Sequence, residues 1–200
     1  MKRLVLASSN PGKIAEITAL LAPLAIEVVP QSHYALQDAE EPHGSFVENA
    51  LAKARHASRD CGLPALADDS GLCVEALGGR PGVQSAYFAG REGSRAERDA
   101  RNNARLLKEL GDQRIAYYAC VLVLARSADD PLPLIAEGLW RGEIARTPRG
   151  ANGFGYDPLF FIPELGKTAA ELEPAHKNGI SHRGRALSKL RELMRDPGRA

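Results

Sequence analysis

One stretch decides the fold of this chain: Tyr117-Tyr118-Ala119-Cys120-Val121-Leu122-Val123-Leu124-Ala125. β-Branched, aromatic and apolar residues follow one another here without interruption, which is typical of a central strand in a sheet. Residues 134–145 alternate between apolar and polar types and predict one or two further strands. Shorter extended segments are predicted at residues 4–7, 26–29, 65–67, 72–77 and 159–162.

Helix-start signals lie between these strands. Asn10 followed by Pro11 predicts a helix that ends near Ala22. An amphipathic helix is predicted to begin near Ser181. Capping-box patterns stand at Ser45 with Glu48, Ser94 with Glu97, and Thr168 with Glu171. Strands and helices in this order predict an α/β protein with a mixed sheet.

Composition limits the class of protein. Two hundred residues suit a single domain over residues 1–200, with room for two lobes. Lys plus Arg number 26 and Asp plus Glu 25, so the net charge favours neither nucleic acid nor a membrane as a partner. The three scattered cysteines fit isolated thiols in a reducing compartment. The apolar run at residues 4–7 is too short for a signal peptide or a membrane span, and we expect a cytoplasmic protein.

The first candidate site is Ser8-Ser9-Asn10-Pro11-Gly12-Lys13, between a predicted strand and a predicted helix. Free backbone N–H groups and the helix dipole favour an anion at such a position. Lys13 is a cation in the first helical turn, where the dipole opposes it, and a bound phosphate would relieve that conflict. The alternative is a capped helix with a solvated lysine, because the loop lacks the Walker A pattern.

The second candidate is Asp68-Asp69-Ser70-Gly71, which we interpret as an acidic turn after a short apolar strand. Carboxylates at a strand end suit a hard cation such as Mg²⁺, and one of them is able to deprotonate a water molecule. A turn in which Asp and Ser cap their own backbone is the structural alternative. Glu40 and Glu41 are candidate remote carboxylates, or part of a solvated acidic loop.

Aromatic and basic residues supply the remaining candidates. Gly153-Phe154-Gly155-Tyr156-Asp157-Pro158 places two rings and a carboxylate in a glycine-rich loop, where rings can stack on a base or simply cover the core. Lys177, with Ser181-His182-Arg183 at an expected helix start, and Lys53 on the predicted helix after Ser45 are candidate ligands, or surface cations. Cations for phosphates, carboxylates for a metal and aromatics for a base together match the requirements of a nucleotide hydrolase.

The chain resembles the Ham1-like family, which contains inosine and xanthosine triphosphate pyrophosphatases, and looks like a bacterial member. The resemblance covers nearly the whole length, with Ser9 and Asn152 standing where the family often has glycine. The motifs that carry it, in family order, are residues 8–13, 46–50, 66–72, 78–82, 153–158 and 181–184.

This resemblance implies hydrolysis of the triphosphates of deaminated purines, such as ITP, dITP and XTP, to the monophosphate and pyrophosphate. It also implies an α/β fold with two lobes around a long central mixed β-sheet, flanking helices, an active-site cleft between the lobes, dependence on Mg²⁺, and a homodimer.

Matching the motifs residue by residue implies Asp69 as the general base and a metal ligand, with Asp68 and Glu41 as neighbouring carboxylates and Glu40 as an alternative to Glu41. Phosphate and sugar ligands would be Ser8, Ser9, Asn10, Pro11, Gly12, Lys13, Lys53 and Ser70. The base and substrate pocket would contain Phe154, Gly155, Tyr156, Asp157, Lys177, His182 and Arg183.

Two other functions remain open at this point. A related pyrophosphatase for modified pyrimidines or methylated bases would share the phosphate chemistry and differ in the base pocket. A nucleotide-binding regulator would need phosphate ligands without a base or a metal carboxylate. Asp69 distinguishes an enzyme from a regulator.

Overall fold

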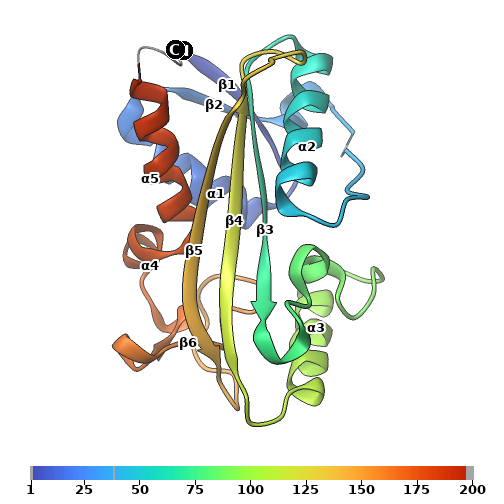
Figure 1. Ribbon diagram of the computed structural model, residues 1–200, viewed down its shortest axis with the longest axis vertical. Coiled ribbons are helices and arrows are strands. Elements are labelled where there is room, and N and C mark those ends of the chain that lie inside the picture. Colours follow the sequence, from blue (N-terminus) through green and yellow to red (C-terminus); the bar gives the residue numbers. More distant parts are fainter. Residues whose placement is uncertain (1, 38, 197–200) are drawn as a thin grey trace. The chain divides into compact units, whose positions relative to one another are not determined.

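The computed structural model describes residues 2–37 and 39–196, and Figure 1 shows its helices and strands. The strands are β1 (Arg3–Ala7), β2 (Glu27–Pro30), β3 (Ala65–Val74), β4 (Ile115–Ala125), β5 (Leu134–Ile144), β6 (Phe160–Ile162) and β7 (Lys167–Thr168). The helices are α1 (Pro11–Leu21), α2 (Phe46–Cys61), α3 (Arg95–Glu109), α4 (Pro174–Ile180) and α5 (His182–Arg195). In the described part of the chain, each helix is too short or too polar to cross a membrane.

The seven strands form one mixed sheet in the order β2-β1-β3-β4-β5-β6-β7. Strand β1 runs parallel to both β2 and β3, whereas β6 runs antiparallel to both β5 and β7. The prediction of an α/β protein with a mixed sheet is therefore confirmed. The chain divides into two compact units, and strands β3, β4 and β5 contribute residues to both.

The first unit contains the residues up to Asp69, Cys120–Gly138 and the residues from His182 onward. Successive side chains of a strand point to opposite sides, and apolar side chains of these strands lie on both faces. Helices therefore pack on both faces of the strands. Figure 1 shows α1 and α5 on one side of these strands and α2 on the other. On the α1 and α5 side the buried core includes Leu4, Leu6, Leu66, Leu122 and Leu124. On the α2 side it includes Val5, Ala7, Ala65, Ala67, Val121 and Val123.

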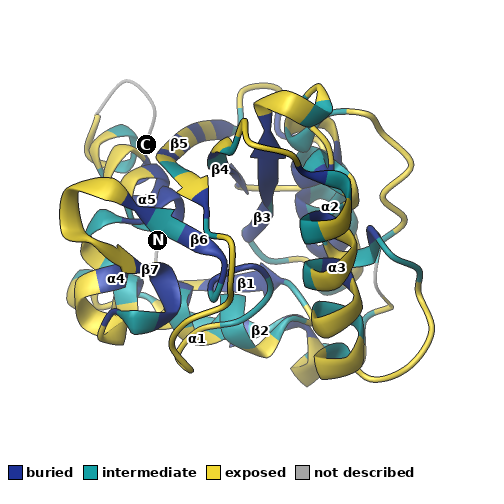
Figure 2. Ribbon diagram, turned by 90° about the horizontal axis from the view of Figure 1, so that it is seen from below, coloured by how far each residue is buried: buried dark blue, intermediate teal, exposed yellow. Residues whose placement is uncertain are grey.

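The second unit contains Ser70–Ala119 and Leu139–Ser181. An aromatic cluster lies in its core: the ring centroid of Phe160 is 4.6 Å from that of Tyr118 and 5.0 Å from that of Trp140. Helix α3 covers this core with Leu106, and its outer face is exposed, as Figure 2 shows. The Ser94 and Glu97 capping box that predicts its start is present.

The predicted acidic turn is wrong. Strand β3 runs without a break from Ala65 to Val74, and Asp68-Asp69-Ser70-Gly71 lies inside it. Asp, Ser and Gly favour turns in general, but here the carboxylates meet cationic partners on both faces of the sheet, so a strand can bury them. Gly71 permits the close approach of a neighbouring segment, since a Cβ atom there would lie 2.2 Å from the carbonyl oxygen of Gly82.

The C-terminal region also differs from the prediction. Lys177 lies in the last turn of the short helix α4, which the sequence pattern did not indicate, and α5 begins separately at His182. The Thr168 and Glu171 capping box is present but opens only a 3-10 turn. The remaining predicted strands and helices agree with the structure to within a few residues at their ends, the usual scatter of such boundaries.

Candidate functional site

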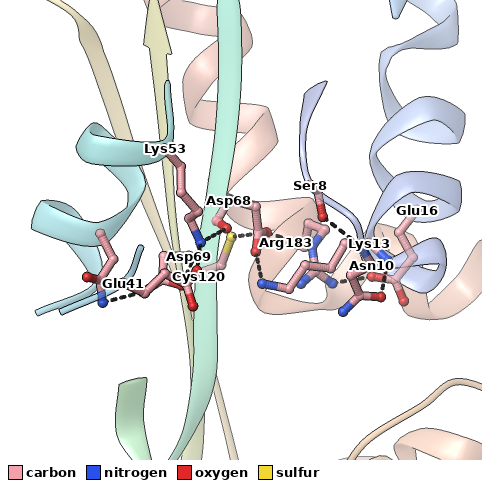
Figure 3. Close-up of polar contacts among 11 residues, drawn as sticks. Ser8, Asn10, Lys13, Glu16, Glu41, Lys53, Asp68, Asp69, Cys120 and Arg183 are labelled. Atoms are coloured by element: carbon pink, nitrogen blue, oxygen red, sulfur yellow. Dashed lines mark hydrogen bonds and ion pairs between the residues drawn. The ribbon is translucent and has the colours of Figure 1, made fainter. Parts of the chain in front are cut away.

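Asp68 and Asp69 are neighbours in β3 but point to opposite faces of the sheet, as expected from the alternation of side chains along a strand. Asp68 faces α1 and α5, whereas Asp69 faces α2, and Figure 3 shows the two groups of partners. Register explains their position in the fold. Strand β1 ends at Ala7, opposite Ala67 of β3, so Asp68 and Asp69 come directly after the point where the chain of β1 turns into α1. The carboxyl ends of parallel strands are the usual ligand-binding edge of such sheets.

The Asp68 carboxylate is completely buried between two cations. One oxygen, Oδ1, lies 2.6 Å from Lys13 Nζ, and the other, Oδ2, accepts a hydrogen bond of 2.8 Å from Arg183 Nε. The thiol of Cys120 also donates to Oδ2 at 3.2 Å. Arg183 continues the chain of charges to Glu16 on α1. Asp68 thus links α1, β3, β4 and α5.

Electrostatics keep this group charged. Burial alone would raise the pKa of Asp68, but the charges of Arg183 and Lys13 hold it well below its usual range. Burial would lower the pKa of Arg183, and the charges of Asp68 and Glu16 raise it instead. Burial and the nearby Asp68 charge raise the pKa of the Cys120 thiol well above its usual value, so the thiol stays protonated and donates.

The Asp69 carboxylate is held by two residues of α2. Lys53 Nζ donates to Oδ1 at 2.9 Å, and Asn49 Nδ2 donates to Oδ2 at 3.3 Å. The same ammonium also donates to Glu41 Oε1 at 2.5 Å and to the backbone carbonyl of Asp68 at 2.8 Å. Lys53 therefore binds two carboxylates, one from β3 and one from the loop that contains Glu41.

Asp69 has an environment suited to proton transfer. Burial raises its pKa, although the charges of Lys53 and Lys13 oppose the shift. A carboxylate with a raised pKa accepts a proton at neutral pH more readily than an exposed one. Burial would lower the pKa of Lys53, but Asp69 and Glu41 raise it overall, so the ammonium remains charged.

The loop between β1 and α1 is ordered by hydrogen bonds from its own side chains. Asn10 caps α1, since its Oδ1 accepts from the backbone N–H of Lys13 at 3.1 Å, and Ser8 Oγ accepts from the backbone N–H of Asn10 at 3.2 Å. The helix N-terminus adds a positive partial charge at this point. Lys13 forms an ion pair with Asp68 and is mostly buried, so it is not simply a solvated lysine.

The donor set also fits a hard metal ion. Glu41 and Asp69 both direct carboxylate oxygens at one cation, the Lys53 ammonium. Mg²⁺ is commonly bound by one or two carboxylates, with water and phosphate oxygens completing the shell. Within residues 2–37 and 39–196 no group of three or more acidic, His or Cys side chains is arranged for a metal, so a bound ion would need ligands from the substrate or water. Glu40 is exposed, and both oxygens of Asp68 and both oxygens of Asp69 have partners, so a metal at Asp69 would displace Lys53 or Asn49 from its carboxylate.

The aromatic loop of the second unit is held by a buried ion pair. Asp157 Oδ2 lies 2.6 Å from Lys177 Nζ and accepts from the backbone N–H of Phe154 at 2.8 Å. Lys177 Nζ also lies 5.1 Å from the centre of the Phe154 ring. Tyr156 is buried and its hydroxyl donates to the carbonyl of Ser85 at 2.9 Å. A Cβ atom at Gly153 would lie 2.0 Å from Asp157 Oδ2, so only glycine fits there.

The structure brings most of the predicted residues into two groups. One group lies in the first unit around β3 (Ser8, Asn10, Lys13, Glu41, Lys53, Asp68, Asp69 and Arg183), and the other lies in the second unit (Phe154, Gly155, Tyr156, Asp157 and Lys177). His182 is buried at the start of α5, and Ser70 is half-buried in β3. Ser9, Pro11 and Gly12 lie at the junction of β1 and α1.

Sequence reasoning missed Asn49 and Glu16. Asn49 is buried, and besides Asp69 it holds the acidic loop: its Oδ1 accepts from the backbone N–H of His43, and its Nδ2 donates to the His43 carbonyl. Its place within the motif at residues 46–50, directly before the small apolar face that begins at Ala50, was the available signal. Glu16 gave none, because an acid on a helix is usually solvated.

This geometry defines a class: an α/β protein in which a helix N-terminus, two lysines and two carboxylates lie at the carboxyl ends of parallel strands, where such folds usually bind their ligands. Residues 4–193 match the model of the Ham1 family, and the chain belongs to that family. It is 61% identical over 197 residues to a "dITP/XTP pyrophosphatase" of Ralstonia nicotianae, covering 98% of each chain.

Solved structures of Ham1 proteins have the same fold as this chain. A HAM1 protein from Coxiella burnetii is 48% identical, with a TM-score of 0.87 over 97% of this chain and 98% of that one. The Ham1 protein of Staphylococcus aureus is 38% identical, with a TM-score of 0.83 over 96% and 98%. The fold and the family expected from the sequence are both confirmed.

Proposed function

We propose that this chain is a nucleoside-triphosphate pyrophosphatase that hydrolyses dITP, ITP and XTP to the monophosphate and pyrophosphate, and so removes deaminated purines from the nucleotide pool. The observation that carries the proposal is Asp69, a buried carboxylate with a raised pKa between Lys53 and Asn49. The names of relatives that are about 60% identical over nearly the whole chain support the substrate class.

The residues around β3 bind the triphosphate and activate water. Lys13, Lys53 and the N-terminus of α1 attract the phosphates. Asp69 accepts a proton from a water molecule at a carboxylate oxygen, and that water attacks the α-phosphorus while pyrophosphate leaves. Glu41 and Asp69 would hold Mg²⁺, which when bound withdraws charge from the phosphate oxygens. Asp68 keeps Lys13 and Arg183 in place.

Mg²⁺ dependence provides a direct test of the metal ligands. Removing metal with a chelator should abolish turnover, and Glu41→Gln should raise the Mg²⁺ concentration for half-maximal activity about tenfold, because a formal charge is lost from the ligand set. Titrations of Mg²⁺ at fixed dITP measure this shift. A larger shift for Glu40→Gln than for Glu41→Gln would instead assign the ligand role to Glu40.

We expect Asn49 to contribute to turnover because it orients the carboxylate of Asp69. Asn49→Ala removes the donor to Asp69 and frees the acidic loop at His43, so we expect kcat/KM for dITP to fall about 10- to 100-fold, the usual effect of losing a residue that orients a ligand. Steady-state kinetics with Arg59→Ala as control, an exposed residue of the same helix, measures the effect. Unchanged kcat/KM in Asn49→Ala would remove Asn49 from the account.

Base selection belongs to the aromatic loop in this proposal. The Phe154 ring offers a face for stacking, and Lys177 lies over that ring. A donor such as Lys177 favours a 6-keto group over the 6-amino group of adenine. A site whose polar groups would be left unpaired by the wrong base discriminates strongly.

The proposal also includes the cellular compartment, the oligomeric state and the substrate cleft. The three cysteines are free thiols, as befits a reducing compartment, and we place the enzyme in the cytoplasm. A homodimer and a substrate cleft between two lobes remain predictions from the family resemblance. Light scattering on the purified protein tests the dimer.

Product analysis tests the function. ITP, XTP, dATP, dGTP and dTTP are incubated separately with the protein and Mg²⁺, and the phosphorus products are identified. We expect pyrophosphate and monophosphate from ITP and XTP at rates far above the other three. Release of orthophosphate, or preference for dTTP, would reject this function, and the second result would favour the pyrimidine alternative. Nucleotide binding without turnover would favour a regulator.

A further inference from the structure

Helix α3 holds the aromatic loop of the second unit at one residue, Gly155. The backbone N–H of Gly155 donates to Asp99 Oδ2 at 3.0 Å, and the carbonyl of Gly155 accepts from Asn103 Nδ2 at 2.9 Å. Asp99 and Asn103 are four residues apart and so lie on the same face of the helix. Both polar groups of Gly155 are therefore fixed to one rigid element.

The backbone conformation of Gly155 sets the direction in which the chain enters and leaves this residue. Gly155 has φ of +64°, in the left-handed region that favours glycine, and a Cβ atom there would meet nothing within 4 Å. It separates Phe154 from Tyr156, whose hydroxyl is fixed to Ser85. A shift of the Gly155 backbone would therefore reach the neighbouring Phe154 directly, whereas the Tyr156 ring is also held by its own hydroxyl.

Charged side chains connect Asp99 to the Phe154 ring. Arg95 Nε lies 3.8 Å from Asp99 Oδ2, and its guanidinium carbon lies 5.0 Å from the centre of the Phe154 ring. Asp99 thus holds both the backbone beside Phe154 and a cation over the ring face. Lys177 provides the second cation near this ring.

Asn103 contributes to this contact through its side-chain amide N–H. Its Nδ2 bonds Gly155, while its buried Oδ1 has no hydrogen-bond partner among the described residues. A buried acceptor without a partner is destabilising, so the residue keeps an unfavourable group in order to supply Nδ2 to the loop.

We propose that Asp99 and Asn103 are positioning residues that set the selectivity for the nucleobase by fixing the backbone of Gly155 and, through it, the Phe154 ring. The inference rests on the proposed function, in which Phe154 stacks on the base. Displacement of a stacking surface by a fraction of an ångström weakens binding of the correct base, and poorly held loops admit the wrong one.

The test compares the ratio of kcat/KM for dITP to kcat/KM for dGTP among variants of α3. Asn103→Asp is nearly isosteric but loses the donor, and Asp99→Ala loses the acceptor. We expect each to lower the ratio about tenfold, mainly through a higher KM for dITP, with kcat within about threefold of wild type because the β3 residues are untouched. Asp99→Asn, which retains an oxygen acceptor, should restore most of the ratio. Lys108→Ala, an exposed change on the same helix, should retain the wild-type ratio.

Thermal unfolding of each variant separates positioning from simple stability. An unchanged ratio in Asn103→Asp and Asp99→Ala would overturn the inference, and so would an equal loss of kcat for both substrates accompanied by a lower Tm. Because Asp99 holds the N–H of Gly155 and Asn103 holds its C=O, either variant alone is a valid test if the other does not fold. Failure of the proposed function is a different result: the wild-type protein would then release no pyrophosphate from dITP.

Discussion

Asp69→Asn is expected to lower kcat for dITP hydrolysis by about a thousandfold, within the range that general-base catalysis usually contributes, while nucleotide binding is largely retained. The amide keeps the size of the carboxylate and still offers an oxygen to Lys53 Nζ. It has no basicity at neutral pH, so water must attack without losing its proton to the protein. Pyrophosphate release measures turnover, and calorimetry with dITP measures binding.

The control for this variant is Asp129→Asn, the same chemical change at an exposed position, and we expect wild-type kinetics from it. Retained turnover in Asp69→Asn would contradict the assignment of Asp69 as the base. Loss of binding together with turnover would show instead that the carboxylate acts mainly as a ligand. The variant should remain folded, since ionised Asp69 is destabilised by burial in the native protein.

Asp68→Asn is expected to have the largest effect on stability, lowering the free energy of unfolding by about 3 kcal/mol, as happens when one partner of a buried ion pair is removed. Arg183 is almost completely buried, and Lys13 is mostly buried. Without the Asp68 charge, both cations would lose their shared partner at Oδ1 and Oδ2. Activity should fall as well, because these contacts hold the start of α1 against β3 and α5.

Urea unfolding at neutral pH measures this loss, and pH dependence identifies its origin. Because the native pKa of Asp68 lies well below that of the unfolded chain, its stabilising contribution is present above the unfolded value of about 4 and is lost as pH falls toward the native value. The difference between wild type and Asp68→Asn should therefore shrink in acid. Asp112→Asn removes an exposed ion pair and should leave the unfolding midpoint nearly unchanged. Equal stability of Asp68→Asn and wild type at pH 7 would refute the role of Asp68 as the link between these elements.

Local sequence patterns predicted several helices and strands correctly but not the strand that contains Asp68 and Asp69. The apolar run at residues 117–125 predicted β4, and the Asn10 and Ser94 caps predicted α1 and α3, because these signals are local. Asp68-Asp69-Ser70-Gly71 looked like a turn because its partners are distant in sequence: Lys53 is 16 residues from Asp69, and Arg183 is 115 residues from Asp68.

The candidate site was predictable as a set of residue types and not as an arrangement. Local pattern could not show that strand alternation sends Asp68 to two buried cations and Asp69 to α2. Nor could it reveal Asn49, Asp99 or Asn103, since Asn and Asp on a helix are ordinarily solvated and only tertiary contacts give these three their roles.

The central claim about the reaction is that water attacks the α-phosphorus, and isotope labelling tests it most directly. Hydrolysis of dITP is carried out in H₂¹⁸O with the protein and Mg²⁺, and both products are analysed by mass spectrometry. The account predicts that ¹⁸O enters the phosphate of the nucleoside monophosphate and is absent from pyrophosphate. Label in pyrophosphate would place the attack at the β-phosphorus, and label in orthophosphate would place it at the γ-phosphorus. Either result would contradict the account.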